Sequence, residues 1–245
     1  MSFSETVRTP KFWLIAVPVV IVLAVVVGPF VYFNFIQEDA PEPLDFGDLA
    51  TTTSSPSAGG GTTATTATFD GSIEGSWEVG DGSTAGYRAT EVLFGQSNEA
   101  AGRSSEVTGT MTVEGTTVTD TSVEVDLTAL SSDEDNRDGQ VQSRILETSQ
   151  FPTATFELSE PIDLGSVPDD GEEVSAEATG ELTIHGVTQE VTVDLAARLN
   201  GSAIEVTGSI PVTWSDYEIN DPSGGPAQVE DNGEMEFALT LSRAA

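Results

Sequence analysis

The sequence predicts an all-β protein: an antiparallel barrel or sandwich of about eight strands with one short inserted helix, preceded by a membrane helix and a linker. From about Gly71 to the C-terminus, apolar and polar residues alternate in short segments separated by Gly, Asn and Asp, which is typical of half-buried strands joined by turns. Before Gly71 the chain has an uncharged apolar run and then a stretch rich in Thr, Ser, Gly and Pro.

Residues 12–37 form the apolar run, which is long enough as a helix to cross a hydrocarbon core of about 30 Å. Arg8 and Lys11 precede it and acidic residues follow it. The positive-inside rule therefore predicts a cytoplasmic segment over 1–11, a transmembrane helix over 12–37, and the rest of the chain outside the cell membrane. A cleaved signal peptide is the alternative, although the run is long for one.

Residues 38–70 are predicted to be a flexible, disordered linker, because runs of Thr and Ser are mixed there with Gly and Pro. A Gly/Ser-rich coil of this length has a root-mean-square reach of roughly 30 Å. The remaining residues, 71–245, form the predicted barrel domain. Alternation is clear within residues 73–79, 107–113, 123–127, 153–158, 180–184, 187–195, 204–214 and 234–241.

One stretch breaks the alternation. The Ser131–Glu134 segment supplies a helix N-cap followed by acidic residues, and Val141 and Ile145 then recur at helical spacing. A short helix is predicted there, ending near Glu147. It would either cap one mouth of the barrel or serve as a plain crossover.

The only histidine of the chain lies at the tip of a predicted hairpin. In the segment Gly180–Thr188, Leu182 and Ile184 face one way and the polar residues the other, and Gly186 permits the turn. The histidine, His185, is either a ligand or headgroup donor or a structural residue that hydrogen-bonds within the turn.

Composition excludes several classes of function. The formal net charge is -33, so the protein should not bind nucleic acid, which requires clustered Lys and Arg. The chain has no cysteine, which excludes disulfides, thiolate metal sites and thiol nucleophiles, and no metal site is predicted. No Ser lies in a Gly-x-Ser-x-Gly context and no acid is an evident interior candidate, so no catalytic residue and no enzyme activity are predicted.

Three segments occur together in a specific order. They are Asn136–Leu146 with its Arg137-Asp138 pair, Phe151–Phe156, and Gly180–Thr188. In this order they resemble the YceI family. The resemblance extends over roughly residues 75–243, with further support from Ser83–Phe94, Ser215–Tyr217 and Val229–Asp231. Many members carry a histidine soon after the Arg-Asp pair, whereas Gly139-Gln140-Val141 follows here, which puts a headgroup contact from that position in doubt.

The resemblance implies a lipocalin-like antiparallel barrel of eight strands whose apolar interior binds an isoprenoid chain, such as a polyprenyl or quinone tail, without other cofactors. The alternation of interior and exterior positions is consistent with such a barrel. The residues expected to line it are Val125, Phe156, Leu182, Ile184, Val193, Ile210, Val212, Trp214 and Phe237. Arg137 and Asp138 are interpreted as a partly buried ion pair that fixes the helix to the barrel, or as headgroup contacts. From the alternation alone, a core filled by side chains is the alternative.

The leading hypothesis is thus a membrane-anchored, extracytoplasmic protein that holds an isoprenoid or similar lipid. A non-catalytic adhesion or interaction domain at the cell surface is the alternative, and a hydrolase with paired carboxylates is a third. The partners are an isoprenoid lipid and, through the N-terminal helix, the membrane; a homodimer is left open.

Overall fold

The computed structural model describes residues 40–49 and 72–244, except for residues 94 and 226. The predicted cytoplasmic segment and transmembrane helix, and the linker apart from residues 40–49, lie outside the described residues. Within those residues, no helix is both long and apolar enough to cross a membrane.

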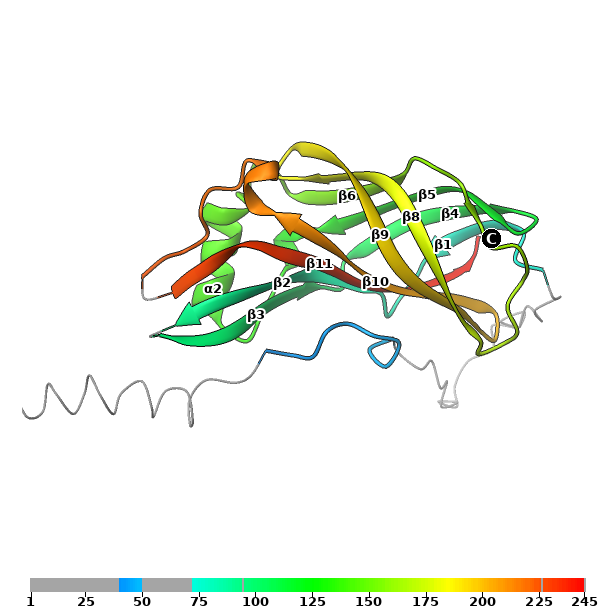
Figure 1. Cartoon of the computed structure of the whole chain (residues 1–245), viewed down its shortest axis with the longest axis horizontal. Helices are drawn as coiled ribbons and strands as arrows, with labels where there is room; N and C mark the ends of the chain where they lie inside the picture. Colours follow the sequence, from blue (N-terminus) through cyan, green and yellow to red (C-terminus); the bar gives the residue numbers. More distant parts are fainter. Residues whose placement is uncertain (1–39, 50–71, 94, 226, 245) are drawn as a thin grey trace, which may run out of the picture. The chain divides into compact units, whose positions relative to one another are not determined.

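The described residues form one antiparallel β-sheet that closes on itself (Figure 1). Its strands are β1 (Gly75–Val79), β2 (Thr84–Leu93), β3 (Gln96–Ser104), β4 (Val107–Glu114), β5 (Thr117–Asp126), β6 (Thr153–Leu158), β7 (Ile162–Asp163), β8 (Glu173–Ile184), β9 (Val187–Asn200), β10 (Ala203–Thr213) and β11 (Ala227–Arg243). The order is β1-β4-β5-β6-β8-β9-β10-β11-β2-β3, and pairing of β1 with β11 closes the ring.

Three pairs of strand segments share a neighbour and act as single interrupted strands. β1 and β2 both pair with the same edge of β11. On their other side, β4 pairs with β1 and β3 pairs with β2. β6 and β7 both pair with β5. The eleven segments therefore make an eight-stranded antiparallel barrel. The predicted all-β class and strand number are confirmed.

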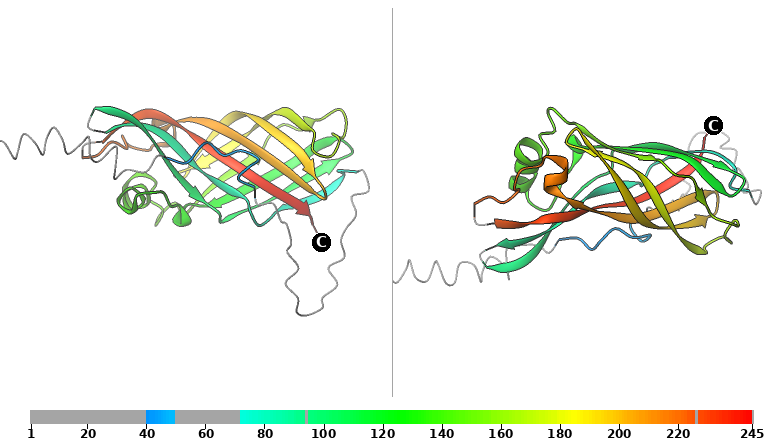
Figure 2. Two further views of the ribbon diagram at one scale, coloured as in Figure 1. Left: turned by 90° about the horizontal axis from the view of Figure 1, so that it is seen from below. Right: turned by 45° about the horizontal axis from the view of Figure 1, so that its top comes forward.

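The inserted helix lies at one end of the barrel, where β3 has no strand partner on its outer edge (Figure 2). After β5 the chain makes a 3-10 turn, η1 (Leu127–Ala129), then α2 (Asp135–Gln140), which continues as the π-helical η2 (Val141–Ile145). An isolated bridge joins Arg103 to Ser131 beside this segment. The predicted helix is confirmed, although its N-cap is Glu134 rather than a serine.

The hairpin between β8 and β9 is confirmed as well. Ile184 pairs with Val187 across a two-residue connection, and both connecting residues have positive φ, +54° at His185 and +75° at Gly186. These angles are those of a type I′ turn, whose twist suits two strands. Directly after β10 the chain forms a 3-10 turn, η3 (Trp214–Tyr217).

Residues 40–49, which we name the N-terminal strap, lie on the outer wall of the barrel. Leu44 and Leu49 are buried against Ala238 of β11, and the guanidinium of Arg198 lies 4.3 Å from the ring centre of Phe46. This part of the predicted flexible linker is therefore packed on the folded domain. Nothing in its composition indicates the contact.

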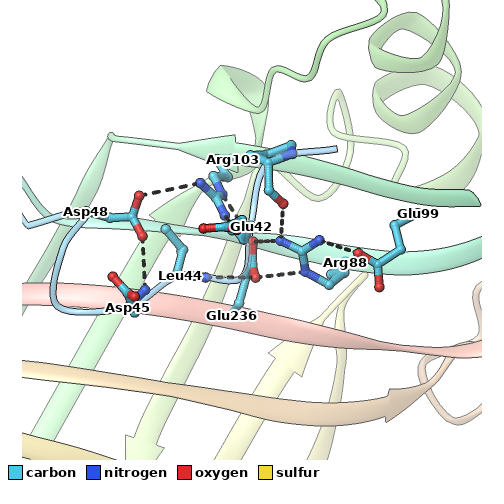
Figure 3. Close-up of polar contacts among 9 residues, drawn as sticks. Glu42, Leu44, Asp45, Asp48, Arg88, Glu99, Arg103 and Glu236 are labelled. Atoms are coloured by element: carbon cyan, nitrogen blue, oxygen red, sulfur yellow. Dashed lines mark hydrogen bonds and ion pairs between the residues drawn. The ribbon is translucent and has the colours of Figure 1, made fainter. Parts of the chain in front are cut away.

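Beneath the strap is a buried ion network (Figure 3). Glu236 of β11 accepts hydrogen bonds from Arg88 Nε at 3.2 Å and Arg103 Nε at 3.1 Å, and the backbone amide of Leu44 donates to it at 3.3 Å. In return, Arg88 donates to the carbonyl oxygen of Pro41 at 2.7 Å, and Arg103 donates to that of Glu42. The strap thus completes the hydrogen bonding of two arginines on the outer wall.

Candidate functional site

The nine residues predicted to line the barrel come together in one cluster. Six are buried: Leu182, Ile184, Val193, Ile210, Val212 and Trp214. The other three, Val125, Phe156 and Phe237, are partly buried and pack against the same cluster. Strand alternation and register place eight of them on the inner face of the sheet, and Trp214, the first residue of η3, packs in the same cluster. The structure therefore assembles the predicted lining, while ligand contact by these residues stays a prediction.

Burial varies along the inner face. Towards the two ends, inward-facing residues such as Ile184 and Leu199 are almost completely buried, at 1% and 2% exposed. A second cluster fills the end near Trp77. Between the clusters, Val125 and Phe237 contact both, and they remain partly exposed although they face inwards. Side-chain packing is therefore less complete between the two clusters than within them.

The aromatic rings of the interior lie across glycines of neighbouring strands. A Cβ atom at Gly208 would lie 2.8 Å from the ring of Phe237, and one at Gly233 would collide with the ring of Trp214. Phe156 lies over Gly180 in the same way, and Tyr87 over Gly102. Each ring therefore occupies the space that a side chain at the neighbouring glycine would fill.

Replacing Gly180 by Ala should destabilise the barrel. The added Cβ would meet the Phe156 ring and also lie 2.5 Å from the backbone carbonyl oxygen of Glu157, so movement of the ring alone cannot relieve the clash. We expect the free energy of unfolding to fall by about 1–3 kcal/mol, measured by urea denaturation. Gly139→Ala is the control. It has open space and lies in α2, so it should leave stability unchanged or raise it.

The helix end of the interior is polar. Glu91 of β2, on the same face as Tyr87 and Ala89, is only 6% exposed and accepts hydrogen bonds from Asn98 Nδ2 at 3.2 Å and Arg137 Nη2 at 3.3 Å. Glu91 is thus a buried acid on the inner face that the sequence did not make evident. Glu91 already has two partners, so it serves as the anchor for the helix.

The predicted Arg137–Asp138 ion pair is also wrong. Arg137 forms ion pairs with Asp133, one turn earlier, and with Glu91. Asp138 instead accepts hydrogen bonds from the amide and hydroxyl of Ser132, at 3.1 and 2.6 Å. Neighbours along a helix point in different directions, so the two side chains of the pair separate. The predicted role of Arg137 in fixing the helix to the barrel holds, with Glu91 as the partner.

Two tyrosine hydroxyls stand out at this end. Among the buried side-chain nitrogen and oxygen atoms of the described residues, only the hydroxyls of Tyr87 and Tyr217 have no hydrogen-bond partner. Both side chains pack within or against the cluster that contains the predicted lining. Burial raises the pKa of Tyr217 to about 12, helped by the nearby charge of Asp216. Burial is also the main cause that raises the pKa of Tyr87. Both groups thus stay protonated hydrogen-bond donors.

His185 is held by its surroundings. Its Nδ1 lies 3.2 Å from the carbonyl oxygen of Tyr217, its Nε2 lies 3.0 Å from Glu147, and its ring meets that of Phe151 edge-on with centroids 4.5 Å apart. The hairpin tip is thereby tied to the end of η2 and to η3. These contacts favour a structural role for this residue, although both partners lie outside the turn, where its hydrogen bond was expected.

We expect His185→Asn to lower the free energy of unfolding by about 1–2 kcal/mol, because asparagine tolerates the left-handed backbone but loses both ring contacts. Lipid affinity should stay within about twofold of the wild type. Thermal unfolding and a lipid titration would check the two parts. A large loss of affinity with stability intact would instead assign His185 to the ligand.

Sequence reasoning missed Tyr87, Tyr217 and Glu91. All three lie in or beside segments that carry the family resemblance, but a single polar residue on an otherwise apolar strand face does not reveal whether it has a partner. In the described part of the chain, no group of three or more His, Asp or Glu side chains is arranged to hold a metal ion.

Comparison with known proteins gives a family and a fold. Residues 77–241 match the YceI-like domain. A polyisoprenoid binding domain from Saccharophagus degradans, implicated in plant cell wall breakdown, has a TM-score of 0.55 and 17% identity, covering 69% of this chain and 98% of that one. Burkholderia cenocepacia BcnA has a TM-score of 0.48 and 20% identity, covering 64% and 95%.

The Campylobacter jejuni YceI protein has a TM-score of 0.41 and 16% identity, covering 55% of this chain and 82% of that one. At such identities the structural likeness concerns the fold alone. No curated protein matches the chain. The family match extends over well over half of the sequence and over nearly the whole barrel, so this protein belongs to the YceI-like family.

Proposed function

We propose that this protein binds an isoprenoid or similar lipid in the interior of its barrel and shields the apolar tail from water. The observation that carries the proposal is the pair of inward-facing but partly exposed apolar residues between the two core clusters, Val125 and Phe237. Membership of the YceI-like family supports it, as does the polyisoprenoid binding of the Saccharophagus degradans domain.

The energetics favour a chain-like occupant. Burial of hydrocarbon contributes about 0.8 kcal/mol per methylene group, so a tail of a few isoprene units binds without many polar contacts. The aromatic rings of Phe156, Phe237 and Trp214, which contact Gly180, Gly208 and Gly233, offer apolar surface to such a tail. The proposal includes no catalytic step.

The proposal extends to location. The apolar run at residues 12–37 and the positive charges before it are the basis for a membrane-anchored protein whose barrel lies outside the cytoplasm. In that arrangement the ligand would exchange with the adjacent bilayer. Protease protection of the full chain in sealed, oriented vesicles would test this part separately.

Native mass spectrometry of the full chain, released from lipid nanodiscs, tests the binding proposal. We expect added mass that corresponds to one polyprenol or quinone, or saturable binding of such a lipid when it is titrated. Recovery of ligand-free protein alone, with no change in tryptophan fluorescence on titration, would contradict the proposal.

A further inference from the structure

We propose that the hydroxyls of Tyr87 and Tyr217 donate hydrogen bonds to an uncharged oxygen acceptor on the ligand's head, so that the barrel selects a quinone-type lipid over a polyprenyl pyrophosphate. This inference rests on the proposed function, and it specifies the ligand's head.

The first observation is the missing partners. A buried hydroxyl without a hydrogen bond is costly, and most buried polar groups in folded proteins are paired. Tyr87 and Tyr217 carry the two exceptions among the described residues. They come from different elements, β2 and η3, yet both pack at the helix end of the interior. An acceptor on a ligand that reaches this end would give both hydroxyls the partner that they lack.

The second observation is their state of protonation. A phenol donates a hydrogen bond only while it keeps its proton. Burial raises the pKa of both hydroxyls, and the carboxylates of Asp138, Asp133 and Glu91 act in the same direction at Tyr87 against the opposing charge of Arg137. Each hydroxyl therefore presents a neutral donor at physiological pH, which suits a carbonyl oxygen.

The third observation concerns charge. A pyrophosphate head needs free cationic donors. At the helix end of the barrel, Arg137 is already paired with Asp133 and Glu91. Arg144 donates to the backbone carbonyls of Asp221 and Pro222, at 3.4 and 2.9 Å. With both guanidiniums engaged and several carboxylates nearby, an anionic head would be repelled, whereas a neutral acceptor would not.

The test compares lipids that share one geranylgeranyl tail: the corresponding menaquinone, geranylgeranyl pyrophosphate, and the headless hydrocarbon. Each is titrated into the full chain in nanodiscs. We expect the quinone to bind about tenfold more tightly than the hydrocarbon, since two net hydrogen bonds are gained. The pyrophosphate should bind more weakly than the quinone.

The variant that tests the assignment is the double substitution Tyr87→Phe with Tyr217→Phe. It should bring the quinone's affinity down to that of the hydrocarbon and leave the hydrocarbon's affinity unchanged. Because the removed hydroxyls have no partner in the empty barrel, the ligand-free variant should be at least as stable as the wild type. Thr192→Val, which removes an exposed hydroxyl on the outer face of β9, is the control and should change none of these values.

Two results would overturn the inference. If all three lipids bind equally, or if the double variant keeps the preference for the quinone, the hydroxyls do not bind the ligand's head and water is their partner. The proposed lipid binding itself would stand in that case. If none of the lipids binds, the proposed function fails and this inference fails with it.

Discussion

Glu236→Ala is expected to lower the free energy of unfolding by about 3–5 kcal/mol, the range for a buried ion pair that loses one partner. The Glu236 side chain is 3% exposed, and it neutralises Arg88 and Arg103, which are 7% and 20% exposed. Its removal leaves Arg88 with Glu99 and Arg103 with Asp48 as ionic partners, both far more exposed than Glu236, and it deprives the amide of Leu44 of its acceptor. An exposed ion pair would contribute only about 0–1 kcal/mol, so burial determines the size of the effect.

Glu234→Ala supplies the matched control. Glu234 lies two residues earlier on the same outer face of β11, but it is exposed, so its loss should change stability by no more than about 0.5 kcal/mol. Urea is the suitable denaturant, because it adds no salt to screen these charges. If the two variants unfolded at the same urea concentration, the buried network would have no part in stability.

Val206→Trp should reduce lipid affinity at least tenfold while changing stability by less than about 1 kcal/mol, if the interior is open as proposed. Val206 faces inwards on β10, opposite Leu239 in register, and is only partly buried. A larger side chain there would occupy the space of the ligand tail. In a solid core the same substitution would cost about 1–3 kcal/mol through overpacking. Stability and affinity therefore distinguish the open interior from a filled one.

Thr192→Trp is the control for this prediction. It adds an indole to an exposed position on the outer face of β9 and should leave affinity and stability near the wild-type values. The chain already has three tryptophans and the added one would fluoresce as well, so affinity is better followed by native mass spectrometry. Unchanged lipid binding by Val206→Trp would show that the ligand does not pass through the middle of the barrel.

The features that could be predicted from the sequence are those that repeat locally. Alternation fixed which residues of each strand face inwards, and so it identified the whole predicted lining. The two positive φ angles at His185 and Gly186 follow from a turn that only a few residue types favour. Helical spacing of Val141 and Ile145 located the insertion to within a few residues.

The features that could not be predicted depend on contacts between distant parts of the chain. Arg137 was expected to pair with its neighbour Asp138, but Glu91, 46 positions away, became its partner because β2 passes beneath α2. The strap was not foreseen for the same reason. The amide of Leu44 donates to Glu236, 192 positions later in the chain, and the composition of the linker does not indicate this contact.

Docking of the strap determines where the connection between the folded domain and the preceding segment begins. Leu49 and Ser72 both belong to the folded unit that contains the barrel, so the residues between them begin and end on one body. The covalent connection between the folded domain and the preceding segment therefore begins at Ala40. Insertions or deletions within residues 50–71 should leave the length of this connection unchanged.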